Sequence, residues 1–179
     1  ISSIGIIKSY HNLLSIVPQA TGDYIYVIGK TGNEIGGSEF AKVFGHENNI
    51  VPQVDKKNAK KNYNNFSKAN QNKLITSAIS VGLGGLAISL AKMAIASQKG
   101  LRITFKDINT YKNKIKNYHV LFSESQSRIL VTVNPLNKMK FESYFKKNQL
   151  SLIGKITKNK KILFTMLNKE EFEVSINSL

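Results

Sequence analysis

The sequence contains no cysteine and no tryptophan, and only three prolines. The absence of cysteine excludes disulfide bonds, thiolate metal ligands and a cysteine nucleophile, and it is consistent with a reducing compartment. No apolar run approaches the roughly 20 residues that a membrane-spanning helix needs. The N-terminal stretch also lacks the features of a secretory signal. We therefore expect a cytoplasmic protein without a membrane partner. Because the first residue is Ile1, we expect the chain to be a piece of a longer protein.

Acidic residues are scarce, since 11 Asp and Glu stand against 26 Lys and Arg, for a net charge of +15. Lysine clusters neutralise phosphate, so this charge is compatible with nucleic-acid binding. However, Arg102 and Arg128 are the only arginines, and specific readers of nucleic acid usually depend on arginine for bidentate contacts. Abundant Lys, Asn and Ile are also typical of an AT-rich genome. A nucleic-acid partner is therefore not favoured.

The few residues capable of acid–base or metal chemistry are scattered along the chain. His11, His46 and His119 have no partner at metal-ligand spacing, so we expect them on the surface. Glu170 and Glu171 are adjacent and would point to opposite faces of a strand. We therefore predict no catalytic residue and no metal ligand, because magnesium sites usually need clustered carboxylates.

The length and the hydrophobic fraction of 41% suit one folded domain over residues 1–179. Runs of β-branched and aromatic residues predict strands at 4–7, 24–28, 75–81, 101–105, 129–133, 152–156, 162–166 and 172–176. Helical spacing and caps predict helices from Ser38 to Gly45, from Asp55 to Leu74, over 86–97 with Gly100 as the stop, and over 135–147. Residues 109–117 are expected to form an exposed loop. The interspersed elements indicate an α/β or α+β fold with a mixed sheet layered with helices.

Two glycine-containing turns each allow two interpretations. Gly36, Gly37, Ser38 and Glu39 place backbone N–H groups and a carboxylate at a helix start, where they could bind phosphate or simply cap the helix. Gly84 and Gly85 lie between a predicted strand and a predicted helix. Such a turn can cradle phosphate, but no Lys-Ser or Lys-Thr follows it, and close packing of the helix on the strand is the favoured interpretation.

The stretch "LFSESQSR", residues 121–128, is polar between two apolar runs. Glu124 can accept hydrogen bonds, Ser125 and Gln126 can donate and accept, and Arg128 can fork onto a carboxylate or phosphate. This combination suits the corner of a binding site. The alternative is a half-exposed strand edge with an internal ion pair between Glu124 and Arg128.

The order of these motifs carries a resemblance to a known family. The chain reads "GDYIYVIGKTGNEIGGSEFAKVFG", "PQVD", "SAISVGLGGLAISLAKMAIA", "LFSESQSRILVTVNP" and "IGKIT" in that order. Together these stretches resemble the synthetase subunit of phosphoribosylformylglycinamidine synthase (FGAM synthase), specifically the AIR-synthetase-like C-terminal domain of its second half. The resemblance covers essentially all 179 residues.

The resemblance implies the C-terminal domain of an ATP-dependent ligase in purine biosynthesis. In the family, ATP, Mg²⁺ and glutamine-derived ammonia convert formylglycinamide ribonucleotide to the amidine. A glutaminase subunit and a small bridging subunit assist the synthetase. The catalytic histidines and main metal ligands lie in other domains, so we expect this domain alone to be inactive and to hold no cofactor. Another ATP-dependent AIR-synthetase-like enzyme, a basic phosphate-binding or nucleic-acid-binding module, and a purely structural domain remain as alternatives.

The resemblance also suggests which residues form a site. Glu124, Ser125 and Gln126 match a triplet that lies at the substrate ribonucleotide in the first half of the family's synthetase, whereas the second half carries a pseudo-site. The second half usually reads Ser-Ala-His-Asp-Val-Ser-(Asp or Glu)-Gly-Gly-Leu, but here Ile79 and Ser80 replace the His-Asp pair. We therefore expect a retained binding-type corner without chemistry, and no measurable binding of ADP with Mg²⁺ by this domain alone. Arg128, Gly36, Gly37, Ser38, Glu39, Gly84 and Gly85 complete the predicted pseudo-site.

Overall fold

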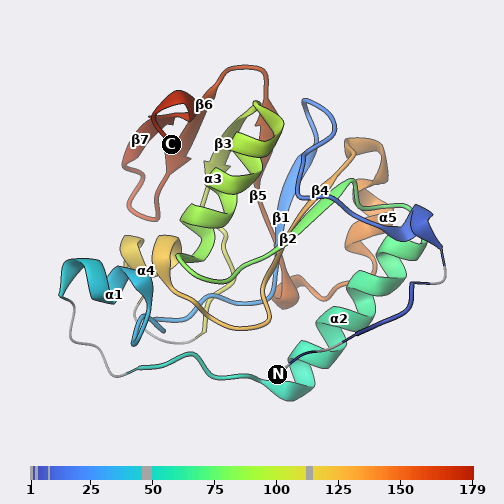
Figure 1. Ribbon diagram of the computed structural model, residues 1–179, viewed down its shortest axis with the longest axis horizontal. Coiled ribbons are helices and arrows are strands. Elements are labelled where there is room, and N and C mark those ends of the chain that lie inside the picture. The colour runs from blue at the N-terminus through green and yellow to red at the C-terminus, as the bar shows by residue number, and fades with distance from the viewer. Residues whose placement is uncertain (1, 3, 8, 46–49, 112–114) are drawn as a thin grey trace.

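A seven-stranded mixed sheet forms the centre of the protein (Figure 1). The computed structural model describes residues 2, 4–7, 9–45, 50–111 and 115–179. The strand order is β2-β4-β1-β5-β3-β6-β7, and the neighbours are antiparallel except for β3 and β6. The strands are β1 (Tyr24–Ile28), β2 (Ser77–Ser80), β3 (Gly100–Thr104), β4 (Ile129–Val133), β5 (Leu150–Thr157), β6 (Lys161–Thr165) and β7 (Glu171–Ser175). The expected mixed sheet with helices is confirmed.

Within the described residues, five α-helices accompany the sheet: α1 (Glu39–Phe44), α2 (Lys56–Gln71), α3 (Gly85–Ser97), α4 (Asn117–Phe122) and α5 (Lys138–Glu142). Both predicted N-caps are confirmed. Ser38 Oγ accepts from the backbone N–H of Ala41 at 3.2 Å, and Asp55 Oδ1 accepts from that of Asn58 at 3.0 Å. Gly45 ends α1 in the left-handed conformation, with φ of 61°.

The sheet carries a hydrophobic core on each face. Alternate residues of a strand point to opposite faces, and β1 shows the division clearly. Ile25 and Val27 join the core packed under α3 and α4, whereas Tyr26 and Ile28 join the core under α2 and α5. In Figure 1, α3 and α4 lie together on one side, and α2 and α5 lie together on the other. All five residues of β4 are likewise buried.

The predicted strand at 4–7 is wrong. Residues 4–7 belong to no strand, and Ile4 and Ile6 are 99% and 96% exposed. Isoleucine favours extended backbone, but a strand also needs a hydrogen-bonded neighbour, and no described strand pairs with this segment.

The predicted helix over 135–147 is also wrong in extent. Pro135–Asn137 form a 3-10 turn, α5 follows, and the helix ends at Glu142. Phe141 and Phe145 still meet, with ring centroids 5.2 Å apart. The two rings are four residues apart in sequence, which is the spacing that brings side chains together on one face of a helix. The periodicity of the sequence therefore predicted a longer helix than the structure contains.

Other boundaries shift by small amounts. The buried strand predicted at 75–81 is shorter, and the last three strands differ from their predicted bounds by one or two residues. Gly100 is not a helix stop but the first residue of β3, because Gln98 ends α3 with φ of 54°. The helix α4 was not predicted. An exposed loop was expected over residues 109–117, which ends at the first residue of α4, and no element was assigned to the residues that follow. Part of that segment, 112–114, lies outside the described residues.

Candidate functional site

Glu124 joins the three polar segments that the sequence singled out. Its Oε1 atom accepts hydrogen bonds from the backbone N–H groups of Glu39, at 3.1 Å, and Gly84, at 3.0 Å. These two residues lie at the starts of α1 and α3, where N–H groups lack helical partners and favour a negative charge. We call the residues Gly36–Glu39, Gly84, Gly85 and Ser123–Arg128 the Glu124 corner.

The glycine turn before α3 is shaped by close packing. Gly84 and Gly85 have φ of +77° and +67°, which only glycine adopts without strain. A Cβ atom on Gly85 would lie 2.6 Å from the carbonyl oxygens of Leu121 and Ser123. The N–H of Gly84 donates to Glu124 and that of Gly85 donates to Gly82. Both amides of a phosphate cradle are therefore already engaged.

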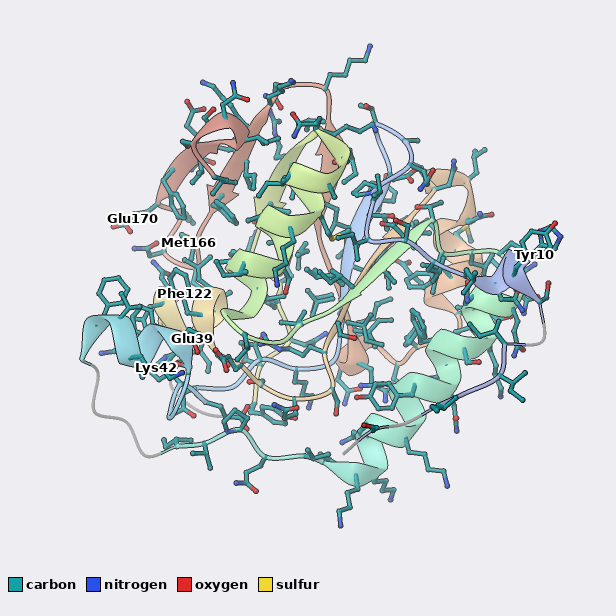
Figure 2. All side chains as sticks on the ribbon, viewed as in Figure 1. Tyr10, Glu39, Lys42, Phe122, Met166 and Glu170 are labelled. Atoms are coloured by element: carbon teal, nitrogen blue, oxygen red, sulfur yellow. The ribbon has the colours of Figure 1, made fainter. Side chains whose placement is uncertain are left out.

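The turn before α1 has the geometry of a helix cap. Ser38 is 1% exposed and caps α1, while the N–H of Gly36 donates to the carbonyl of Ile50 at 2.9 Å. The side chain of Glu39 points to solvent and pairs with Lys42 at 2.7 Å. In the view of Figure 2, these two side chains of α1 are drawn beside Phe122 of α4, and Phe40 of α1 stacks on Phe122 with ring centroids 5.1 Å apart. The outward carboxylate of Glu39 therefore plays no part in binding Glu124, which contacts the Glu39 backbone.

The Ser-Gln part of the triplet divides between the interior and the surface. Ser125 is 1% exposed, and its Oγ accepts from the N–H of Gly32 at 2.9 Å and shares a hydrogen bond with Ser123 Oγ at 2.8 Å. Gln126 is exposed and donates to the carbonyl of Glu124 at 3.3 Å. Of the predicted triplet, Gln126 is therefore the side chain turned toward solvent.

Arg128 is buried, at 1% exposure, and binds the loop from inside. Nε donates to the carbonyl of Ser125 at 3.0 Å, Nη1 donates to Oγ1 of Thr31 at 3.0 Å, and Nη2 donates to the carbonyl of Ser123. Burial lowers the pKa of Arg128 to about 10, and the nearby Glu34 partly opposes this effect. The guanidinium therefore remains charged at neutral pH.

This arrangement corrects the alternative interpretation of the stretch. Residues 123–128 form a largely buried loop between α4 and β4, not a half-exposed strand edge. The described side chains of Glu124 and Arg128 do not form an ion pair, because each is committed to other partners. The contributions of Thr31 and Gly32 were missed, since nothing in their sequence position signals contact with a segment so distant along the chain.

A small polar pocket of about 40 Å³ lies beside Gln126. Lys30 is part of its wall, and its ammonium lies 5.7 Å from the centre of the Tyr111 ring. The remaining lining includes Asn58, Asn62 and Gln149, which carry amide side chains, and the acidic residue Asp55. Gln126 and Ser127 are thus residues of the Glu124 corner that line this pocket.

The Glu124 corner does not fit a magnesium–nucleotide complex. The backbone N–H groups of Gly36, Glu39, Gly84 and Gly85 are paired with the protein's own groups. No three His, Cys, Asp or Glu side chains of the described residues group as a metal site. His119 is not on the surface as expected but 6% exposed, because its Nδ1 accepts from the N–H of Lys116 at the start of α4. His11 is exposed, and His46 lies outside the described residues. Over the same part of the chain, no helix has the length and apolarity needed to cross a membrane.

The fold and the Glu124 corner define a class of protein: an α+β domain in which one carboxylate joins the starts of two helices beside a mixed sheet. Residues 20–166 match the family described as AIR synthase related protein, C-terminal domain. The chain belongs to this family, as its resemblance implied.

Relatives and solved structures agree with this assignment. The chain is 32% identical over 170 residues to "Phosphoribosylformylglycinamidine synthase subunit PurL" of Thermococcus sibiricus, covering 95% of the chain and 23% of the relative. It is 36% identical over 136 residues to the protein of the same name from Methanocaldococcus jannaschii, covering 75% and 18%. The chain therefore spans about a quarter or less of the length of these curated relatives.

Among solved structures, "T. maritima PurL complexed with FGAR" superposes with a TM-score of 0.81 at 17% identity, covering 94% of this chain and 27% of that one. "Crystal structure of HypE-HypF complex" superposes with a TM-score of 0.65 at 15% identity, covering 90% and 55%. At these identities the structures show a shared fold.

Proposed function

We propose that this chain is the C-terminal domain of the second half of an FGAM synthase synthetase, the ATP-dependent carbon–nitrogen ligase of purine biosynthesis. The observation that carries the proposal is the meeting of "GGSE", the glycine turn and the Glu-Ser-Gln triplet at one carboxylate, Glu124. The names of the relatives support the same assignment. Residues 1–179 would form one domain of the longer synthetase.

The reaction would proceed through an activated amide. Phosphoryl transfer from ATP to the amide oxygen of formylglycinamide ribonucleotide gives an iminophosphate and ADP, and ammonia then displaces phosphate to form the amidine. The Glu124 corner supports a scaffold role in that enzyme, because its carboxylate and amides satisfy one another. Glu124, Ser125 and Gln126, with Arg128 behind them, would be a retained corner of a pseudo-site that performs no chemistry.

The solved structures are consistent with a nucleotide-dependent assembly. They include T. maritima PurL complexed with ATP and with ADP, and the structure of PurLQS from Thermotoga maritima. For the present protein we extend this to ATP and Mg²⁺ in the whole enzyme, a glutaminase subunit and a small bridging subunit, all in the cytoplasm. The other synthetase domains would be the direct neighbours of this chain.

The test is an assay of the full-length protein that carries this chain. With formylglycinamide ribonucleotide, ATP, Mg²⁺ and ammonium chloride, it should release ADP, phosphate and the amidine, which mass spectrometry identifies. The 179-residue chain alone should form no product and should show no heat of binding with ADP and Mg²⁺. Failure of the full-length protein to form the amidine would overturn the ligase assignment.

A further inference from the structure

An apolar groove of about 210 Å³ lies between α3 and the strands β6 and β7. In Figure 1 these three elements lie on the side of the molecule away from α2 and α5. All ten residues that line the groove are apolar, although charged residues make up 21% of the chain. The helix α3 contributes Ala87, Ile88 and Ala91, and β7 contributes Phe172 and Val174. We call this feature the α3–β7 groove.

The α3–β7 groove is open to solvent. Ile88 of α3 and Phe172 of β7 are 42% and 40% exposed. Phe164 also lines the groove but is only 4% exposed, and it stacks on Phe172 with ring centroids 4.9 Å apart. A further apolar side chain placed between Ile88 and Phe172 would therefore pack against the hydrophobic core.

The apolar surface continues from the groove to α1. Phe122 of α4 lines the groove and stacks on Phe40 of α1 with ring centroids 5.1 Å apart. Phe40 in turn contacts Phe44, with centroids 4.8 Å apart. Phe44 and its neighbour Val43 are 69% and 74% exposed. An exposed apolar surface that spans several elements is typical of an interaction site.

The chemistry of this surface favours a protein segment over a small ligand or a lipid surface. A small-molecule site normally holds a few polar groups that orient the ligand, and no polar side chain lines this groove. The exposed residues Glu170, Glu171 and Glu173 lie in and beside β7. Their negative charges would repel the anionic headgroups of a membrane.

We propose that the α3–β7 groove is covered by an apolar segment of another domain of the same synthetase polypeptide, which inserts a large apolar side chain between Ile88 and Phe172. This inference rests on the proposed function, which supplies such a domain. The chain spans 23% and 18% of the length of the two relatives described above, so most of a polypeptide of that length lies outside it.

Covalent linkage and composition both favour this occupant. A segment of the same polypeptide is present at a high effective concentration, whereas a second copy must be recruited from solution. Interfaces as free of charge as this groove are typical of permanent contacts, which resemble a hydrophobic core cut in two.

Photocrosslinking in the full-length protein identifies the occupant. One variant carries p-benzoylphenylalanine in place of Phe172 and a second carries it in place of Ile88, and mass spectrometry locates the peptide that each captures. Both should capture the same apolar segment from outside residues 1–179 of the same polypeptide, because the two positions line one groove. The replacement of Phe172 keeps a phenyl ring, so it tests the proposal even if the Ile88 variant does not fold.

Ile95 provides the matched control. It lies on the same helix and is also 42% exposed, but it does not line the groove. Because the photoreactive group captures only what it contacts, p-benzoylphenylalanine in place of Ile95 should yield about tenfold less of the same cross-link than it yields in place of Ile88.

Several results would overturn the proposal. These are a covalent dimer on a denaturing gel, capture of a copurifying subunit, capture confined to residues 1–179, equal capture at positions 88 and 95, and no capture from the groove. If the unmodified full-length protein forms the amidine, any of these results rejects this inference alone. If it does not, the proposed function itself is rejected.

Discussion

Arg128 donates a hydrogen bond to Oγ1 of Thr31, at 3.0 Å, between residues 97 positions apart. The contact ties the residue just before β4 to the segment that leaves β1. Two further hydrogen bonds from the same guanidinium hold the carbonyls of Ser123 and Ser125. One buried cation therefore fixes the inner side of the loop whose outer side carries Gln126.

Replacement of Arg128 by lysine should destabilise the protein by about 3 kcal/mol or more, because an ammonium cannot reach three separated acceptors from one position. Urea unfolding followed by circular dichroism measures the change. Arg102→Lys on the exposed side of β3 is the control and should change stability by less than about 0.5 kcal/mol. Equal effects of the two substitutions would show that the Arg128 hydrogen bonds do not stabilise the loop.

Substitution of Glu124 should separate the effect of its charge from that of its hydrogen bonds. Glu124→Gln keeps an acceptor oxygen and should cost about 1 kcal/mol, whereas Glu124→Ala leaves two N–H groups unpaired and should cost about 3 kcal/mol. Amide hydrogen exchange should accelerate at Glu39 and Gly84 in the alanine variant. Unchanged exchange at both amides would contradict the double hydrogen bond.

Alanine at position 85 should be strongly destabilising. Gly85 has φ of +67°, and a Cβ atom there would lie 2.6 Å from two backbone oxygens. We expect Gly85→Ala to cost more than about 3 kcal/mol, combining backbone strain with displacement of α4 from α3. Gly82→Ala is the nearby control, because nothing lies within 4 Å of a Cβ atom there. Thermal unfolding should show a much lower stability for Gly85→Ala than for Gly82→Ala. Equal stability of the two variants would mean that α4 can move away from position 85 at no cost.

Tyr26 should make the protein sensitive to alkali. Burial, together with the hydrogen bond to Glu142, raises the pKa of Tyr26 well above its usual value of 10.0. The unfolded chain ionises first, so this contribution to stability is complete below about pH 10 and falls by about 1.4 kcal/mol per pH unit above it.

Tyr26→Phe tests this pH dependence. The variant loses the hydrogen bond to Glu142 and should be about 1 kcal/mol less stable at neutral pH. Because phenylalanine cannot ionise, the deficit should shrink above about pH 10 and then reverse. Urea unfolding across that range measures it, and a constant deficit would show that Tyr26 ionises as readily in the folded state.

The features that were predictable from the sequence are local ones. Ser38 and Asp55 cap the helices that follow them, because a cap depends on only three or four consecutive residues. The strand Tyr24–Ile28 was also predicted with its observed bounds, since it is buried on both faces and reads as an unbroken run of β-branched and aromatic residues. Residues 4–7 show the limit of such reasoning, because their composition suits a strand for which no described neighbour exists.

The site was predictable in its parts but not in its assembly. Glu124, Gly84 and Glu39 were each singled out, yet their shared hydrogen bonds depend on how α1, α3 and the loop before β4 pack. The short helix Asn117–Phe122 escaped prediction because its six residues include Asn, Tyr, His and Val, all weak helix formers. The α3–β7 groove carried no recognisable signal, because its lining comes from α3, α4, β6 and β7 and meets only in the folded chain.

The position of β5 has a consequence for the synthesis of the protein. This strand, Leu150–Thr157, lies between β1 and β3 and hydrogen-bonds to both. Before the ribosome has produced Leu150 and the residues that follow it, β3 has no neighbour with which to join the sheet already available from β2, β4 and β1. Two apolar surfaces of the domain therefore remain incomplete until this central strand emerges, and nascent-chain proteolysis within the domain should remain efficient up to that point.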